Sequence, residues 1–264
     1  MPEPLRVLLT NDDGIHAPGI AALSEAFHQA GGFDVWTVAP DRERSTCSHG
    51  MTLGTPVSVL RTAPQAFAVG GLPADCVFIA KHGLLPSPPT VVVSGINRGA
   101  NLGSDVIFSG TAAGARQAAL MGMHGIAVSL VEGDDYSISA EMTVQLVQRN
   151  ASRLPETPLL LNINFPAGRP AGIRLSTLGK RNYPQTLFPE RPFDGERGAF
   201  RLGGPDVKDS LLPGSDGLLI HRGIASATLL SVDQTDNPRM QDALRLEGID
   251  PWEGNARPRS PSVL

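Results

Sequence analysis

The sequence predicts an α/β protein, with a mostly parallel β-sheet covered by helices on both faces and a less regular C-terminal part. Apolar runs rich in β-forming residues alternate with helical hydrophobic spacing over about 165 residues, the pattern of parallel α/β sheets. After Pro166 the texture changes, and glycine, proline and arginine become frequent. We therefore expect a core over residues 1–166 and an extension over residues 167–264. The extension is expected to carry short hairpins and a helix, either for association with another subunit or as surface loops.

The chain opens with a strand, a helix and a second strand. An apolar run over Leu5–Thr10 is followed by helical spacing over residues 18–30, with a proline in the first turn and Gly31 at the end. Residues 33–39 form the next strand. Two strands joined by one helix are almost always parallel, with a right-handed connection. The carboxyl ends of both strands are therefore expected at the same edge of the sheet.

The later elements continue this alternation up to Pro166. Further core elements are expected as strands at residues 91–93, 125–130 and 158–163, short strands or a hairpin within 56–69, and helices at 74–85, 109–121 and 137–153. In the extension, the candidates are short strands at residues 173–178, 218–221 and 225–232 and a helix at residues 237–246. After the strand at 91–93 we expect a glycine-rich loop over residues 94–103.

The composition argues against several classes of protein. The formal net charge is −4, whereas binding to the backbone of a nucleic-acid polymer needs a basic face. The two cysteines, Cys47 and Cys76, lack metal-ligand spacing, so neither a disulfide framework nor a structural zinc site is expected. No apolar run approaches the ~18 residues of a membrane span, and the first residues do not resemble a signal peptide. We expect a cytoplasmic protein with no membrane partner.

Two adjacent carboxylates follow the first strand. Asp12 and Asp13 stand between Asn11 and Gly14, and the glycine lets the chain leave the strand so that both side chains can face one ligand. Two ionised carboxylates without a nearby cation repel each other, and a bound metal ion removes the conflict. The alternative is that Asn11 and Asp12 only form a turn and cap the helix that begins near Pro18.

Oxygen-bearing side chains also follow two other predicted strands, Ser45 after the second strand and Asn97 after the strand at 91–93. In open parallel sheets, ligands bind beyond the carboxyl ends of the strands, so these side chains are expected near the two carboxylates. Carboxylate, amide and hydroxyl oxygens suit Mg²⁺ or Mn²⁺, whereas zinc is expected to recruit histidine or cysteine. We predict one divalent cation per subunit, with Asp12, Asp13, Ser45 and Asn97 as its ligands.

The small-residue helix opens with Ser109-Gly110-Thr111. Free backbone N–H groups and the positive end of the helix dipole make such a start a ready site for an anion such as phosphate. The alternative is that Ser109 or Thr111 only caps the helix, and that the small residues allow close packing on the sheet. A phosphate site that faces a metal site implies phosphoryl transfer, most simply hydrolysis.

Six short motifs stand in order between residues 11 and 166. They are Asn11-Asp12-Asp13-Gly14, Ala17-Pro18-Gly19-Ile20, Ala39-Pro40-Asp41-Arg42 with Ser45, Ser94-Gly95-Ile96-Asn97 with Gly99, Asn101 and Gly103, Ser109-Gly110-Thr111, and Asn162-Ile163-Asn164 with Pro166. Together they resemble the survival protein E (SurE) family of metal-dependent nucleotidases. The resemblance implies a Rossmann-like core, metal ligands at Asp12, Asp13, Ser45 and Asn97, and dimers or tetramers that exchange C-terminal segments. It also implies hydrolysis of nucleoside 5′- and 3′-monophosphates and, in some members, of short polyphosphate.

We therefore predict a 5′-nucleotidase that binds a nucleoside monophosphate and assembles as a homodimer or homotetramer. The residues assigned to catalysis are Asp12 and Asp13, and those assigned to substrate binding are Asn11, Asn101, Ser109, Gly110 and Thr111. Direct attack by water and transient phosphorylation of a carboxylate such as Asp12 both stay open. A non-catalytic nucleotide-binding or assembly protein is the first alternative. A dinucleotide-dependent oxidoreductase is less favoured, because the first strand does not end in a Gly-x-Gly-x-x-Gly turn.

Overall fold

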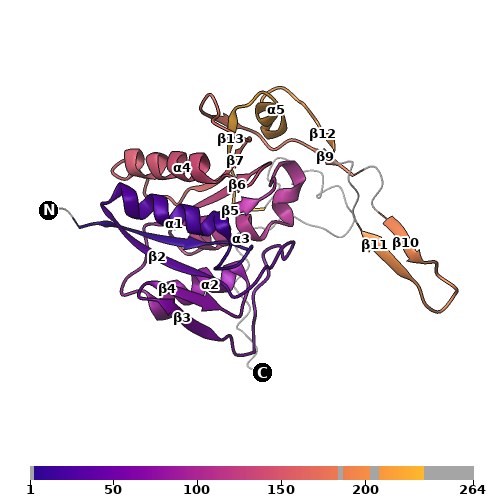
Figure 1. Cartoon of the computed structure of the whole chain (residues 1–264), viewed down its shortest axis with the longest axis horizontal. Coiled ribbons are helices and arrows are strands. Elements are labelled where there is room, and N and C mark those ends of the chain that lie inside the picture. The colour runs from indigo at the N-terminus through magenta and orange to yellow at the C-terminus, as the bar shows by residue number, and fades with distance from the viewer. Residues whose placement is uncertain (1–2, 184–186, 203–207, 235–264) are drawn as a thin grey trace, which may run out of the picture. The chain divides into compact units, whose positions relative to one another are not determined.

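The computed structural model describes residues 3–183, 187–202 and 208–234. Its main sheet contains β1 (Leu5–Thr10), β2 (Phe33–Pro40), β3 (Val59–Ala63), β4 (Ala66–Val69), β5 (Val91–Arg98), β6 (His124–Leu130), β7 (Leu160–Phe165), β8 (Ile173–Ser176) and β13 (Ala225–Leu229). The nine strands are ordered β3-β4-β2-β1-β5-β6-β7-β13-β8 (Figure 1). All pairs are parallel except β3 with β4 and β13 with β7. The prediction of a mostly parallel sheet is confirmed.

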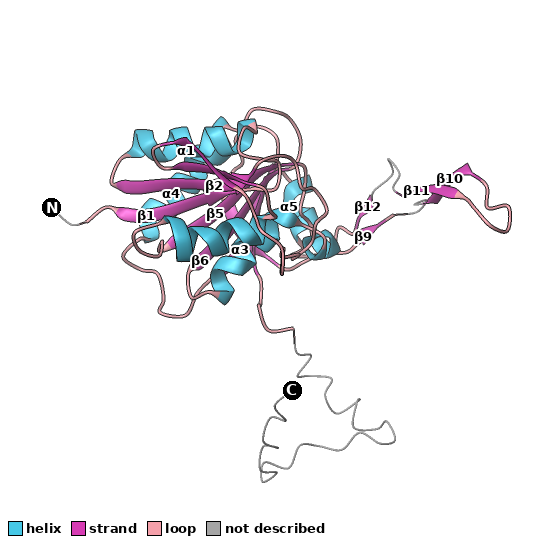
Figure 2. Cartoon of the chain, turned by 90° about the horizontal axis from the view of Figure 1, so that it is seen from below, coloured by secondary structure: helices cyan, strands magenta, loops and turns pink. Residues whose placement is uncertain are grey.

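Helices cover both faces of this sheet. The helices are α1 (Pro18–Ala30), α2 (Pro73–Ile79) with its π-helical continuation η1 (Ala80–Leu84), the short η2 (Gly103–Ile107), α3 (Gly110–Leu120), α4 (Ser137–Asn150) and α5 (Asp216–His221). Helix α1 contacts α4, and α2 contacts α3. Figure 2 shows α1 on one face of the sheet and α3 on the opposite face. Among the described residues, no helix is long and apolar enough to cross a membrane.

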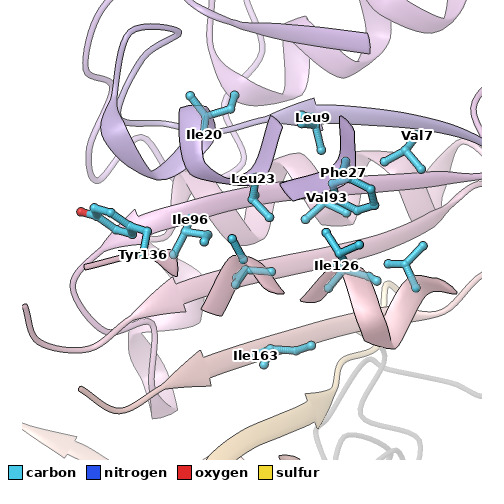
Figure 3. Packing of buried hydrophobic residues seen from close by; sticks show 14 of the residues in the cluster. Val7, Leu9, Ile20, Leu23, Phe27, Val93, Ile96, Ile126, Tyr136 and Ile163 are labelled. Carbon is cyan, nitrogen blue, oxygen red and sulfur yellow. The ribbon is translucent and has the colours of Figure 1, made fainter. Parts of the chain in front are cut away.

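Side chains along β1 alternate between the two faces of the sheet, and those on each face pack against a layer of helices. Val7 and Leu9 belong to the core under α1 and α4, whereas Leu8 belongs to the core under α2. All three side chains are buried, because successive strand residues point to opposite faces and each face meets a helix layer. The first of these cores, with Phe27 of α1 and Ile126 of β6, is drawn in Figure 3. This burial holds β1 in the interior of the sheet, between β2 and β5, and so positions the loop that follows β1.

Two sequence predictions about local structure are wrong. Residues 94–98, expected as a loop, continue strand β5, which pairs with β6 through a bulge between Ser94 and Asn97. Residues 218–221, expected as a strand, lie in helix α5, because the Ser215 hydroxyl accepts the backbone N–H of Leu218 and caps the helix. The helix expected at residues 237–246 lies outside the described residues.

The chain beyond Pro166 contributes to the same sheet, through β13 and β8. It also forms two small antiparallel strand pairs, which agree with the short hairpins expected in this part, although the sequence did not predict their positions. These are β9 (Arg181–Asn182) with β12 (Lys208–Asp209), and β10 (Leu187–Arg191) with β11 (Ala199–Leu202). All of these elements lie within the compact unit formed by residues 1–232.

Candidate active site

The candidate site lies where the order of the sheet reverses. From β1 the chain proceeds to β2 on one side, whereas β5, β6 and β7 follow on the other side. Such a switch point leaves an opening beyond the carboxyl ends of the strands, where ligands of open α/β sheets bind. Asp12 and Asp13 follow β1 directly, and Asn97 stands near the end of its neighbour β5. The sheet topology therefore brings the predicted acidic loop and the predicted amide to the same edge.

The loop after β1 is fixed by its own asparagine. The buried Asn11 amide donates to the carbonyl oxygen of Gly14 at 2.8 Å and accepts the Gly14 N–H at 3.2 Å. Gly14 has φ +101°, and a Cβ there would lie 3.1 Å from the Arg42 backbone, so this position favours glycine. The loop also bonds to the loop after β2, where Arg44 N–H donates to the Asp12 carbonyl oxygen at 2.6 Å. Asn11 thus shapes the turn that presents the two carboxylates.

Asp12 carries a buried carboxylate. Its side chain is 4% exposed, and the Thr111 hydroxyl donates to its Oδ1 atom at 2.5 Å. Burial, with a smaller contribution from the charge of Asp13, raises the pKa of Asp12 from 3.8 to about 6. The first turn of α3 lies against it, since a Cβ on Gly110 would be 2.8 Å from Asp12 Oδ2. The site therefore holds a charge that the protein alone does not compensate.

Asp13 is less buried than Asp12. Its Oδ2 atom accepts the backbone N–H of Arg98 at 3.1 Å. Burial raises the pKa of Asp13, and the nearby charge of Glu43 adds to this rise, which the Arg98 hydrogen bond opposes. Among the ion pairs of the described residues, none includes either carboxylate of this pair. Besides burial, the charge of Asp13 raises the pKa of Asp12, so the repulsion expected from the sequence is present in the structure.

Two adjoining cavities contain the four predicted metal ligands. Asp12, Ser45 and Asn97 line a cavity of about 640 Å³. Asp13 lines a neighbouring cavity of about 450 Å³, and Ser45 belongs to the lining of both. The Asn97 side-chain N–H group donates to the Gly99 carbonyl oxygen at 2.9 Å, and the Ser45 hydroxyl donates to Glu43 at 2.7 Å.

The donor chemistry fits a hard divalent cation. In the described part of the chain, no three His, Cys, Asp or Glu side chains come together as a metal site. The four predicted ligands instead offer two carboxylates, one amide and one hydroxyl, which are oxygen ligands of the kind Mg²⁺ and Mn²⁺ take. A cation here would also offset the raised pKa of the buried Asp12 carboxyl.

The start of α3 lies beside the same cavity. Ser109 lines it and caps the helix, because its hydroxyl accepts the Ala112 N–H at 2.9 Å. The cap expected at Ser109 or Thr111 is thus made by Ser109, and the Thr111 hydroxyl donates to Asp12 instead. Asn101 also lines this cavity. Asn101 and Ser109 therefore line the same cavity as three of the four predicted ligands, whereas Gly110 and Thr111 follow Ser109 without lining it.

A family model described as "Survival protein SurE" matches residues 7–185 of this chain. The chain belongs to the SurE family. The 5′-nucleotidase SurE of Anaeromyxobacter dehalogenans (strain 2CP-C) is 41% identical over 243 residues, which cover 90% of this chain and 94% of that protein. The 5′-nucleotidase SurE of Syntrophotalea carbinolica is 43% identical over 235 residues, covering 87% and 92%.

A solved structure of the family has the same fold. The crystal structure of the SurE protein from Aquifex aeolicus matches with a TM-score of 0.79 and 31% sequence identity, and the match covers 92% of this chain and 99% of that chain. The family resemblance and the α/β fold expected from the sequence are both confirmed.

The SurE motif Asn162-Ile163-Asn164 has a role that the sequence did not predict. Both asparagine amides donate to the Asn101 carbonyl oxygen, at 2.8 and 3.0 Å, and the Asn164 side-chain oxygen accepts the Asn101 N–H at 2.9 Å. All three asparagines are buried. The signal in the sequence was two asparagines two residues apart, with Asn162 inside the strand expected at residues 158–163 and Asn164 directly after it. They hold in place the loop that carries Asn101 into the cavity.

Proposed function

We propose that this SurE chain is a divalent-metal-dependent phosphomonoesterase that hydrolyses nucleoside 5′- and 3′-monophosphates to nucleoside and phosphate, with short-chain polyphosphate as a further substrate. The observation that carries the proposal is the buried Asp12 carboxylate, which lies beside Asp13 without an ion-pair partner among the described residues and against the first turn of α3. The relatives named 5′-nucleotidase support the choice of nucleotides as the substrate class.

The cation is proposed to be one Mg²⁺ or Mn²⁺ per subunit, held by Asp12, Asp13, Ser45 and Asn97. When bound, it would supply the positive charge that polarises a phosphoryl oxygen. The chain itself contributes the rest. The Thr111 hydroxyl orients the Asp12 carboxylate, and the amino end of α3 favours the negative charge of the phosphate.

The substrate is proposed to lie in the larger cavity, because predicted substrate-binding residues line it. Asn101 and Ser109 line this cavity, and Gly110 and Thr111 follow in the first turn of α3. Asn11 contributes indirectly, because its side chain holds the turn that positions the carboxylates. Asp12 and Asp13 are the proposed catalytic residues.

The subunits are proposed to form a homodimer or homotetramer in the cytoplasm, through exchange of segments from residues 167–264. Exposed apolar side chains in the described part of this extension support a partner surface. They include Leu175, Leu178, Leu211, Leu212 and Leu229. The two free cysteines, Cys47 and Cys76, are consistent with a reducing compartment.

The test is phosphate release from a panel of nucleoside 5′- and 3′-monophosphates, polyphosphate and a generic phosphate ester, each with Mg²⁺, Mn²⁺ or EDTA. We expect release from the mononucleotides that EDTA abolishes and Mn²⁺ or Mg²⁺ restores. Asp13→Asn should abolish it, whereas Asp134→Asn, a change at an exposed aspartate without a side-chain hydrogen bond in the described structure, should not. Nucleotide binding without release in the wild type would favour the non-catalytic alternative. Release that EDTA does not affect would contradict the metal assignment.

A further inference from the structure

Two aromatic side chains line the larger cavity together with the candidate site residues. They are Phe108 and Tyr183, which are 59% and 41% exposed. Exposing aromatic rings to water is unfavourable. Apolar surface in a cavity that is otherwise lined by polar side chains commonly marks a ligand contact. Nothing in the metal or phosphate sites requires them.

Phe108 has a backbone that is fixed on both sides. Its N–H donates to the Asp105 carbonyl oxygen at 2.9 Å, and its carbonyl oxygen accepts the N–H of Ser48 at 2.9 Å. The next residue, Ser109, caps α3 and also donates its N–H to the Asp105 carbonyl oxygen, at 3.1 Å. The ring is therefore attached one residue before the proposed phosphate-binding turn.

Tyr183 is held through the side chain of the same aspartate. Its hydroxyl donates to Asp105, and the Arg181 guanidinium donates to this carboxylate at 2.6 Å and to Asp209 at 2.8 Å. Burial, with the hydrogen bond to Asp105, raises the pKa of Tyr183 to about 12. The hydroxyl thus stays a neutral donor at working pH. Asp105 links both aromatic residues to one short helix, η2.

The cavity lining is therefore chemically mixed. It includes Asp12, Asn97 and Ser109, which carry oxygen ligands, and Phe108 and Tyr183, which carry aromatic rings. A nucleotide combines the matching groups, an anionic phosphate and a flat heteroaromatic base. The volume of about 640 Å³ lies in the usual range for small-ligand sites.

We propose that Phe108 and Tyr183 bind the nucleobase of the substrate by stacking on its face. This inference rests on the proposed function, because it names the part of the same site that selects nucleotides over other phosphate esters. Stacking uses the face that every base presents and does not read its edges. All common bases are therefore accepted, with purines bound better than pyrimidines because their faces are larger.

The test compares adenosine 5′-monophosphate with ribose 5-phosphate, which has the same sugar and phosphate but no base. The quantity measured is the ratio of kcat/KM for the two substrates with Mn²⁺. Phe108→Ala and Tyr183→Leu are each expected to lower this ratio by about tenfold or more. Tyr183→Phe keeps the ring and is expected to lower it less. Ile107→Ala is the matched control, because Ile107 is adjacent and 63% exposed but does not line the cavity, and the ratio should not change.

An unchanged ratio in both ring-removing variants, or an equal fall in Ile107→Ala, would overturn the proposal. A Phe108→Ala variant with an altered oligomeric state and an unchanged ratio would also overturn it and would assign the ring to a subunit contact. Calorimetric titration with adenosine 5′-monophosphate in Mn²⁺ separates this test from that of the proposed function. If the wild type hydrolyses neither substrate, the proposed function fails, and weaker binding in Phe108→Ala than in Ile107→Ala would still support stacking. Equal binding in these two variants would refute it.

Discussion

Replacing Asp12 with asparagine should make the metal-free protein more stable while abolishing its activity. Asparagine has nearly the same shape, and its side-chain oxygen can still accept the Thr111 hydroxyl. What changes is the charge of a side chain that is only 4% exposed. The variant therefore removes the cost of burying a carboxylate and removes a predicted metal ligand at the same time.

The magnitude follows from the pKa of Asp12, which burial raises from 3.8 to about 6. The carboxyl binds its proton more tightly in the folded state, so its favourable contribution is complete below pH 3.8 and is lost as the pH rises through 6. At 1.36 kcal/mol per pH unit, the loss is about 3 kcal/mol at pH 8. The neutral asparagine of the Asp12→Asn variant has no such loss. In EDTA at pH 8 the variant is expected to be more stable by up to about 3 kcal/mol, and at pH 4 the two proteins should be similar.

The assay is urea unfolding followed by circular dichroism at a fixed protein concentration, in EDTA and in Mn²⁺. Saturating Mn²⁺ should stabilise the wild type, by about 2.7 kcal/mol at 100 times the dissociation constant, and should have little effect on Asp12→Asn. Two results would refute the reasoning: a variant that is less stable than the wild type in EDTA at pH 8, or a variant that Mn²⁺ stabilises as much as the wild type.

Three further outcomes are expected. Gly110→Ala should lower kcat for nucleotide hydrolysis by about tenfold or more, because the new Cβ would meet the Asp12 side chain at 2.8 Å. Gly83→Ala is the control, because a Cβ there meets no atom within 4 Å, and its kcat should not change. Steady-state kinetics measure both variants. The rise in Tm caused by Mn²⁺ should be large at pH 8 and shrink below about pH 6, since protons compete for Asp12; thermal unfolding across pH measures it, and a pH-independent rise would be the contrary finding. Asn164→Ala should lower the free energy of unfolding by about 1–3 kcal/mol, because the Asn101 N–H loses its acceptor. Urea unfolding measures this change, and a negligible difference from the wild type would contradict the prediction.

The parts of the site that depend on neighbouring residues in the chain could be predicted from the sequence. The adjacent carboxylates, Gly14 and the Ser109 cap are all recognisable within a few residues of chain, and the structure has them where the strand and helix pattern indicated. The strand predicted at residues 218–221 was wrong because a short apolar run fits a strand and a helix equally well. The Ser215 cap decided between them.

Long-range contacts account for what the sequence did not predict. The Tyr183 hydroxyl meets Asp105 across 78 residues, and Asn162 meets Asn101 across 61 residues. No spacing rule connects such positions, because their proximity follows from the order of the strands and the path of the extension. Asn97 was expected in a loop, yet it lies in β5 after a bulge. Its position at the carboxyl edge of the sheet was nevertheless predicted, because β5 ends at the same edge as β1.

The central claim is that oxygen atoms from three separate loops and strands share one divalent ion. Crystals of the protein grown with MnCl₂ test it most directly, through the anomalous scattering of manganese. The expected result is one peak per subunit within coordination distance of the Asp12 and Asp13 carboxylates, with Ser45 and Asn97 completing the protein ligands. An anomalous peak elsewhere, or none at this position in crystals of active enzyme, would contradict the claim.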